Sequence, residues 1–168
     1  MLCLCGCASL RGPRAPAGPA PSPPPAAAEP ATAPPGAERR ALMVATATGM
    51  LGQPYRFGGA APGGFDCSGL VVYAAGAAGL SLPRTAQEQL HSGVAVKRAE
   101  LQAGDLVFLH LKRKELHVGI ALDQARFIHA PSSGGHVRVD SLAAPPYAGG
   151  FLTARRVLQG GAPARSEH

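Results

Sequence analysis

Tryptophan is absent from this 168-residue sequence, and aromatic residues make up only 5% of it. Proteins that bind single-stranded nucleic acid stack bases on aromatic side chains within a basic groove. The net charge of +6 is instead spread over small basic clusters that are not interleaved with aromatics. The composition therefore argues against nucleic-acid binding, while a moderate positive charge suits an acidic polymer as substrate.

The sequence also lacks long apolar runs and has few cysteines. No stretch approaches the roughly 18 consecutive apolar residues that a transmembrane helix needs. Any attachment to a membrane is therefore expected to come from a lipid anchor. Three of the four cysteines stand within the first seven residues, which leaves Cys67 alone in the rest of the chain. No further cluster of metal-binding side chains is visible, so we expect no metal site and no cofactor.

The first seven residues carry a signal of their own. The letters LCGC at positions 4–7, followed by two small residues, resemble the lipobox of bacterial lipoproteins, in which the last cysteine is lipidated. A secretory signal needs a basic start and an apolar segment of ~7–15 residues, whereas only six residues precede Cys7. We interpret residues 1–7 as a truncated lipoprotein signal, with a metal-binding C-x-C-x-C or a disulfide pair as the alternative. The protein would then face the periplasm in the bacterial cell envelope, held to the outer membrane by a lipid on Cys7.

Composition divides the remaining chain into three parts. Residues 1–38 contain 10 of the 17 prolines and are otherwise rich in alanine, so they offer little bulky apolar surface to bury. We expect residues 8–38 to be a disordered linker and residues 159–168 to be a disordered polar tail. Residues 39–158 then form the single compact domain for which the chain has enough material.

Within that domain, helical patterns come first and strand patterns follow. Helices are predicted at 38–51, at 67–79, and at 86–91, where Thr85 and Glu88 have the spacing of a capping box. Strands are predicted at runs rich in Val, Leu, Ile and Phe, namely 106–111, 117–122, 126–130, 137–139 and 151–157. This order predicts an α+β fold in which N-terminal helices pack on an antiparallel β-sheet.

Cys67 lies between a glycine-rich loop at 58–64 and the apolar helix predicted at 67–79. A thiol in the first turn of a helix feels unpaired backbone N–H groups and the positive end of the helix dipole, and both favour thiolate over thiol. The position therefore makes Cys67 a candidate nucleophile. The alternative is a buried structural cysteine that behaves as a small hydrophobic residue.

Two histidines begin and end neighbouring predicted strands. If the hairpin between them centres on Asp123, residues whose numbers sum to 246 face each other, and His117 and His129 are such a pair. Their Cβ atoms would lie ~4.5–5.5 Å apart on one face of the sheet, within reach of a shared hydrogen bond. A register one step different would place them on opposite faces, which leaves two unrelated surface histidines as the alternative.

Six short segments then combine into a family resemblance. They are PYRFGG (54–59), FDCSGLV (65–71), LPRT (82–85), AGDLVF (103–108), HVGI (117–120) and FIHA (127–130). In this order and spacing they resemble the NlpC family of papain-like cysteine peptidases over residues 51–157. The resemblance implies a papain-like NlpC fold and a bacterial cell-wall hydrolase that cleaves peptide bonds in peptidoglycan stems or cross-links. We expect a monomer that takes peptidoglycan stem peptides as its partner.

The chemistry of these side chains and the family resemblance assign the same catalytic roles to Cys67, His117 and His129. Cys67 would attack the substrate carbonyl, His117 would act as its base, and His129 would orient His117. A neutral third residue stabilises an imidazolium less than a carboxylate does. The helix N-terminus would therefore have to supply more of the stabilisation of the thiolate. The family further implies an oxyanion role for Tyr55 and substrate-groove roles for Asp66, Ser68 and Arg84. The remaining histidines match no catalytic position and are expected at the surface or in loops: His91, His110, His136 and His168.

Two other functions remain open from the sequence. A papain-like amidase or acyltransferase on another substrate would keep the same fold and nucleophile. A catalytically idle module that only binds the cell wall is the second, which the intact set of one cysteine and two histidines disfavours.

Overall fold

The structure is a computed structural model, and it describes residues 35–111 and 115–159. The predicted lipidation site Cys7, residues 8–34 of the predicted linker, His168 and all but residue 159 of the predicted tail lie outside the described residues. Those assignments stay predictions. Among the helices in the described ranges, none combines the length and the apolar character needed to cross a membrane.

The described residues contain three α-helices, and each corresponds to a predicted one with shifted ends. They are α1 (Pro35–Thr48), α2 (Cys67–Ala77) and α3 (Ala86–Gln89). The first starts and ends three residues earlier than expected, with a proline at its first position, where the missing N–H removes no helical hydrogen bond. The third begins with the predicted capping box: Glu88 N donates to Thr85 Oγ1, and the Glu88 carboxylate accepts from Thr85 N.

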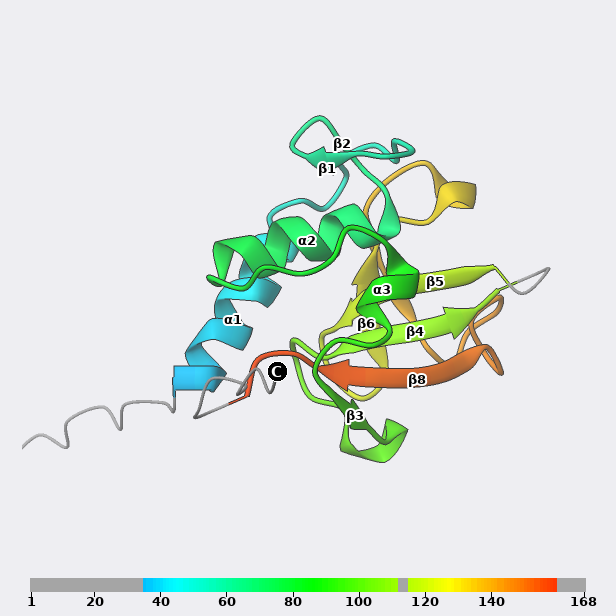
Figure 1. The fold of residues 1–168 in the computed structure, drawn as a ribbon. Coiled ribbons are helices and arrows are strands. Elements are labelled where there is room, and N and C mark those ends of the chain that lie inside the picture. The colour runs from blue at the N-terminus through cyan, green and yellow to red at the C-terminus, as the bar shows by residue number, and fades with distance from the viewer. Residues whose placement is uncertain (1–34, 112–114, 160–168) are drawn as a thin grey trace, which may run out of the picture. The chain divides into compact units, whose positions relative to one another are not determined.

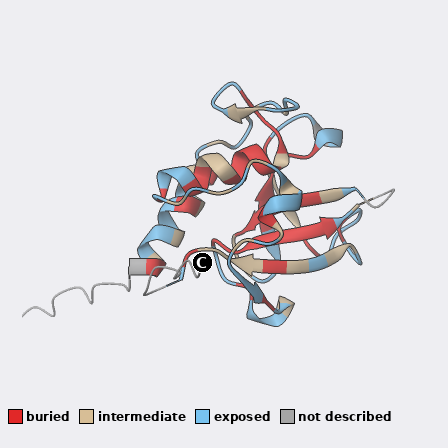
Figure 2. Ribbon diagram, in the orientation of Figure 1, coloured by how far each residue is buried: buried red, intermediate tan, exposed pale blue. Residues whose placement is uncertain are grey.

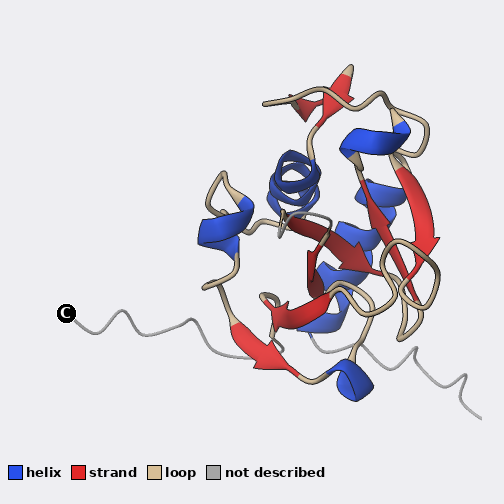
Figure 3. Ribbon diagram, turned by 90° about the vertical axis from the view of Figure 1, so that its right-hand side faces the viewer, coloured by secondary structure: helices blue, strands red, loops and turns tan. Residues whose placement is uncertain are grey.

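The predicted antiparallel sheet is confirmed, with six strands in the order β3-β8-β4-β5-β6-β7. A separate two-stranded ladder, β1 with β2, lies in the glycine-rich loop. Figure 1 shows α1 and α2 to one side of the large sheet, and Figure 3 shows how strongly that sheet is twisted. The strands are β1 (Ala60–Ala61), β2 (Gly64–Phe65), β3 (Val94–Val96), β4 (Leu106–His110), β5 (Leu116–Ala121), β6 (Arg126–His129), β7 (Arg138–Ser141) and β8 (Phe151–Arg156).

Alternate residues of the central strands build two hydrophobic cores, one on each face of the sheet. On one face, Phe108, Val118 and Ile120 pack with apolar residues of α1 and α2. On the other face, Phe127 and Tyr147 belong to a second core, closed by loop residues that follow β7. Figure 2 shows the buried stretches of α2 and of the central strands. The buried helix α2 is therefore fixed against β5, the strand that carries His117.

The N-terminal turn of α2 is held close to the glycine-rich loop. A Cβ at Gly69 would collide with the carbonyl oxygen of Gly59, so only glycine allows this approach. The Asp66 side chain caps the helix by accepting from Gly69 N at 2.7 Å, and it also accepts from Gly58 N at 3.0 Å. These contacts fix the position of the next residue, Cys67.

Candidate active site

Cys67 is the first residue of α2, and its free thiol is partly exposed. The backbone N–H groups of Val118, Ser68 and Cys67 itself lie near the sulfur, and each lowers the pKa of the thiol. Val118 follows His117 in β5, and the ladder between β5 and β6 begins only at Ile120. The sulfur therefore lies where these two strands separate, beside the start of β5.

Burial raises the pKa of the Cys67 thiol above its ordinary value, and the charge of Asp66 adds to the rise. The three backbone N–H groups oppose it, as expected for a helix N-terminus, but they do not overcome the loss of hydration. The prediction that this position favours the thiolate is therefore wrong for the resting protein. A nearby base must take the proton before the sulfur can act as a nucleophile.

The two histidines of the predicted hairpin are hydrogen-bonded, with His117 Nε2 2.7 Å from His129 Nδ1. Both side chains are buried, and their rings meet edge to face at 83°. The predicted hydrogen bond is confirmed. Burial and the neighbouring ring lower the pKa of His117 to about 3, and burial lowers that of His129 to about 4 against the opposing effect of Asp140. Both rings are therefore neutral at neutral pH.

The register predicted for this hairpin is wrong by two residues. Ile120 pairs with Ile128 and Ala121 with Phe127, so the paired numbers sum to 248. The cause is the turn, in which Asp123 Oδ1 accepts from the N–H groups of Ala125 and Arg126 and so occupies the start of the loop, not its centre. Because a shift of two preserves the face of each side chain, the histidines still meet, but diagonally.

Continuing that register places Gly119 opposite His129. A Cβ at Gly119 would lie 2.7 Å from Phe127 Cδ2, 2.9 Å from the Ile128 carbonyl oxygen and 3.0 Å from His129 Cβ. The absence of a side chain therefore makes the room in which His129 reaches His117.

Replacing Gly119 with alanine is expected to destabilise the fold and to displace His129. Overpacking of this kind costs about 1–3 kcal/mol, which denaturant unfolding measures directly. The matched control is Gly76→Ala, because Gly76 is exposed within α2 and has no atom within 4 Å of an added Cβ. We expect that substitution to be neutral or stabilising. Equal stability of the Gly119→Ala protein and the wild type would contradict the steric role of Gly119.

Behind His129 lies a carboxylate that the sequence reasoning missed. Asp140 Oδ2 is 3.0 Å from His129 Nε2 and 2.8 Å from Arg138 Nε, and Arg138 Nη2 donates to Tyr147 Oη at 3.3 Å. Burial alone would raise the pKa of Asp140, but hydrogen bonds from Arg138, His129 and Tyr147 lower it overall. His129 is thus not the end of a neutral chain, because an ionised carboxylate follows it.

A signal for Asp140 exists in the sequence. The strand segment RVDS at 138–141 places two charged residues on the same face, on either side of Val139. A charged pair on one face of a strand next to a histidine-bearing strand is a reason to look for a hydrogen bond between them.

The residues predicted to line the substrate groove form one connected cluster. Arg84 Nη1 donates to Asp66 Oδ1 and to Ser68 Oγ, each at 3.0 Å, and Arg84 Nη2 donates to Asp66 Oδ2 at 2.6 Å. The Arg84 side chain remains 41% exposed, whereas that of Asp66 is 11% exposed. The cluster flanks Cys67, since two of its members adjoin it in the sequence.

Tyr55 lies close to the same group. Burial raises the pKa of its hydroxyl, and the charges of Cys67 and Asp66 raise it further. The structure therefore gathers all the predicted site residues within the described ranges near the start of α2. The histidines given no catalytic role, His91, His110 and His136, are exposed as expected.

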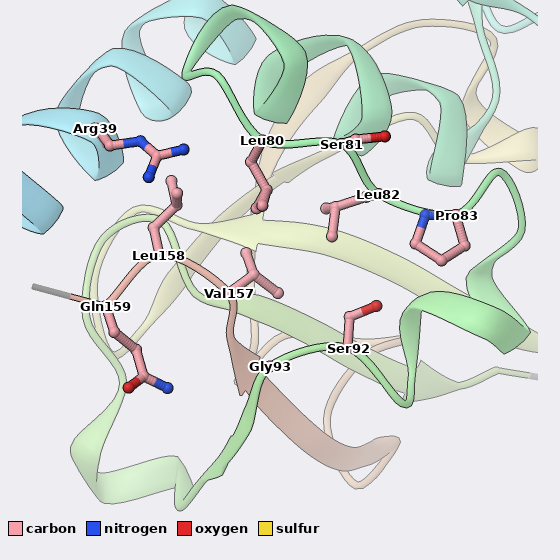
Figure 4. Close-up of a pocket in the computed structure, with 10 residues that line it drawn as sticks. All are labelled: Arg39, Leu80, Ser81, Leu82, Pro83, Ser92, Gly93, Val157, Leu158 and Gln159. Atoms are coloured by element: carbon pink, nitrogen blue, oxygen red, sulfur yellow. The ribbon is translucent and has the colours of Figure 1, made fainter. Parts of the chain in front are cut away.

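A separate recess lies on another part of this domain (Figure 4). It has a volume of about 480 Å³ and is bordered by the start of α1, the loop before α3 and the end of the described chain. Its lining residues are Arg39, Leu80, Ser81, Leu82, Pro83, Ser92, Gly93, Val157, Leu158 and Gln159. None of them is a predicted site residue, so this recess gives no support to a catalytic role.

Known proteins resemble the chain over the segment that holds the candidate active site. A sequence model of the NlpC/P60 family matches residues 52–156. The probable endopeptidase YafL of Escherichia coli is 43% identical over 114 residues, covering 64% of this chain and 46% of that protein. The murein DD-endopeptidase MepH of Escherichia coli is 39% identical over 114 residues, covering 64% of this chain and 42% of that protein. The chain thus spans less than half the length of either relative.

Solved structures agree with the sequence comparison. A crystal structure of an NlpC/P60 family protein from Bacillus cereus superposes with a TM-score of 0.67 at 32% identity, covering 71% of this chain and 40% of that chain. The matched segment includes the start of α2 and both histidine strands. The chain, with its mixed helical and antiparallel architecture, belongs to the NlpC/P60 family.

Proposed function

We propose that the protein is a cysteine endopeptidase that hydrolyses amide bonds in the stem peptides or cross-links of peptidoglycan. The observation that carries the proposal is the hydrogen-bonded pair of buried histidines at the strand against which the Cys67 sulfur lies. Membership of a family whose members include a murein DD-endopeptidase supports the choice of substrate.

In the proposed reaction, His117 removes the proton from the Cys67 thiol as the sulfur attacks the substrate carbonyl carbon. The tetrahedral intermediate collapses when His117 returns the proton to the leaving nitrogen, which releases an amine and leaves a thioester on Cys67. A water molecule, deprotonated by His117, then hydrolyses the thioester and regenerates the thiol. His129 keeps the His117 ring in the orientation that both transfers need.

Nearby groups supply the electrostatic part of this mechanism. Backbone N–H groups at the sulfur stabilise negative charge as the proton leaves. The hydroxyl of Tyr55, which lies close to Cys67, would donate to the oxyanion. Arg84, held by Asp66 and Ser68, keeps an exposed guanidinium beside the nucleophile and would contact the substrate peptide.

Replacing His129 with a residue that carries an amide should preserve more activity than replacing it with alanine. In His129→Asn, the amide oxygen can accept from His117 Nε2, so we expect activity to remain within about tenfold of the wild type. In His129→Ala, His117 loses its partner and its fixed orientation, and kcat/KM should fall by about 100-fold. Thermal unfolding of both variants controls for loss of the fold, because His129 is fully buried. Wild-type kcat/KM in His129→Ala would show that another group orients His117.

Product analysis separates this function from the alternatives. Purified wall fragments incubated with the protein should yield new amino groups between stem residues, detected by mass spectrometry. A papain-like amidase or acyltransferase would leave those bonds intact and act on another substrate. An idle wall-binding module would show neither cleavage nor accelerated labelling of Cys67 by a thiol reagent.

We also propose that the protein works as a monomer in the bacterial cell envelope, on the periplasmic side. The lipobox-like segment supports attachment through a lipid on Cys7, with the proline-rich segment as a spacer to the peptidoglycan. A lipid mass on Cys7 in protein extracted from membranes would agree with this placement, and an unmodified Cys7 would contradict it.

A further inference from the structure

Three side chains at the site form a hydrogen-bonded chain that ends on a carboxylate. It runs from His117 through His129 to Asp140, which Arg138 holds in place. We infer that Asp140 is a positioning residue that fixes the tautomer of both histidines, and that this leaves the Nδ1 lone pair of His117 free to take the Cys67 proton. The inference rests on the role proposed above for His117.

The position of the hydrogen on the His129 ring follows from its contact with Asp140. An ionised carboxylate can only accept hydrogen bonds, and the hydrogen bonds to Asp140 keep it ionised. Asp140 Oδ2 therefore accepts from His129 Nε2, 3.0 Å away, and the hydrogen must be on that nitrogen. The guanidinium of Arg138, which always donates, occupies the same oxygen at 2.8 Å and prevents the carboxylate from turning away.

The position of the hydrogen on His129 also determines the tautomer of His117. A buried neutral imidazole carries one proton, so a hydrogen on His129 Nε2 leaves His129 Nδ1 as an acceptor. The hydrogen bond of 2.7 Å between the rings then requires His117 Nε2 to donate. Since His117 is also neutral, its own Nδ1 is bare, which is the state that a general base needs.

The surroundings leave that nitrogen available. Among the described residues, no group is hydrogen-bonded to His117 Nδ1, and the ring is bonded through Nε2. The backbone N–H of Val118, the next residue in β5, lowers the pKa of the Cys67 thiol, so the thiol lies in the neighbourhood of His117. The opposite tautomer would put a hydrogen on Nδ1 and block proton transfer from the thiol.

Among the described residues, the other side chains around the two histidines do not supply a second carboxylate. Rings of Phe127 and Tyr147 pack against His129, with centroids 4.4 and 5.1 Å away. The charged and titratable groups that act on the histidines are Asp140 and Arg138, with Tyr147 adjoining both of these. Asp140 is therefore the only carboxylate among the described residues that contacts either ring.

Asp140→Asn tests the inference, with Asp140→Glu as the conservative variant. Loss of the carboxylate should lower kcat by about 10- to 100-fold and change KM little, because the tautomer is no longer fixed. Asp140 raises the pKa of His129, so its removal should lower the pKa of His129 and move the acid limb of the kcat/KM profile to lower pH. Asp140→Glu should keep the position of that limb. A merely structural role would lower activity without moving the limb.

The matched control is Asp123→Asn. Asp123 is likewise bound to an arginine three residues away, at the β5–β6 turn, but it contacts no histidine. We expect this variant to keep the wild-type kcat and pH profile. If Asp140→Asn shows the same rate and the same profile as Asp123→Asn, the inference is overturned.

Ring ¹⁵N NMR of the histidines tests the tautomer in the wild-type protein and needs no substrate. The expected result is a bare Nδ1 and a protonated Nε2 on His117, with a second tautomer appearing in Asp140→Asn. A protonated Nδ1 on wild-type His117 would overturn the inference while leaving the peptidase function standing. The expected tautomer in a protein that does not cleave wall fragments would refute the proposed function alone.

Discussion

Cys67→Ala is expected to reduce the hydrolysis of wall fragments to the level of a blank, a loss of at least about 10⁴-fold in kcat. The substitution removes the sulfur that forms the thioester, and no second cysteine lies within the described residues. Alanine is a good helix former and Cys67 is only partly buried, so the free energy of unfolding should change little. The measurement is turnover of a defined muropeptide, followed by chromatography.

Cys67→Ser provides a matched control for that experiment. It keeps the shape of the side chain and its place beside the backbone N–H groups of Val118 and Ser68, but a hydroxyl is a far weaker nucleophile here than a thiol. We expect it to be nearly as inactive as alanine while it still binds the substrate. Turnover by Cys67→Ala at the wild-type rate would remove Cys67 from the mechanism.

His117→Asn is expected to have the second largest effect, a loss of about 10²- to 10⁴-fold in kcat. Asparagine can still donate a hydrogen bond toward His129, but it cannot take a proton from the thiol. The raised pKa of Cys67 makes this loss severe, because a thiol with a raised pKa depends more strongly on a base to take its proton. Kinetics at saturating substrate report the change in kcat.

An exposed histidine supplies the comparison for this variant. His110 lies at the end of β4, is exposed, and is not part of the hydrogen-bonded chain. His110→Asn should therefore retain full activity and stability. Should His117→Asn match it in kcat, some other residue carries the proton.

The sequence predicts best the features that depend on neighbouring residues. The capping box at Thr85 and Glu88 forms as expected, and α2 begins at Cys67, because caps and apolar periodicity are local signals. The five predicted strands also form, since each is a run of β-branched and apolar residues. Strands β1, β2 and β3 were not predicted, because two or three residues carry no periodic pattern.

The sequence predicts that two histidines of the candidate site meet, but it does not predict how the site is arranged. The pairing of His117 with His129 survives a wrong register because the error of two residues leaves the faces unchanged. The thiol pKa could not be read from the chain, since burial opposes the helix terminus and burial is a tertiary property. Asp140 was missed for the same reason, because its place depends on how β7 pairs with β6.

Cys67 is proposed to be the nucleophile that cleaves amide bonds in peptidoglycan stem peptides or cross-links. The most direct test incubates wild-type and Cys67→Ala protein with one cross-linked muropeptide and assigns the products by mass spectrometry. The wild type is predicted to release fragments that carry a new amino group within a stem or cross-link, and Cys67→Ala to leave the substrate intact. Intact substrate with the folded wild type, or identical fragments from both proteins, would contradict the claim.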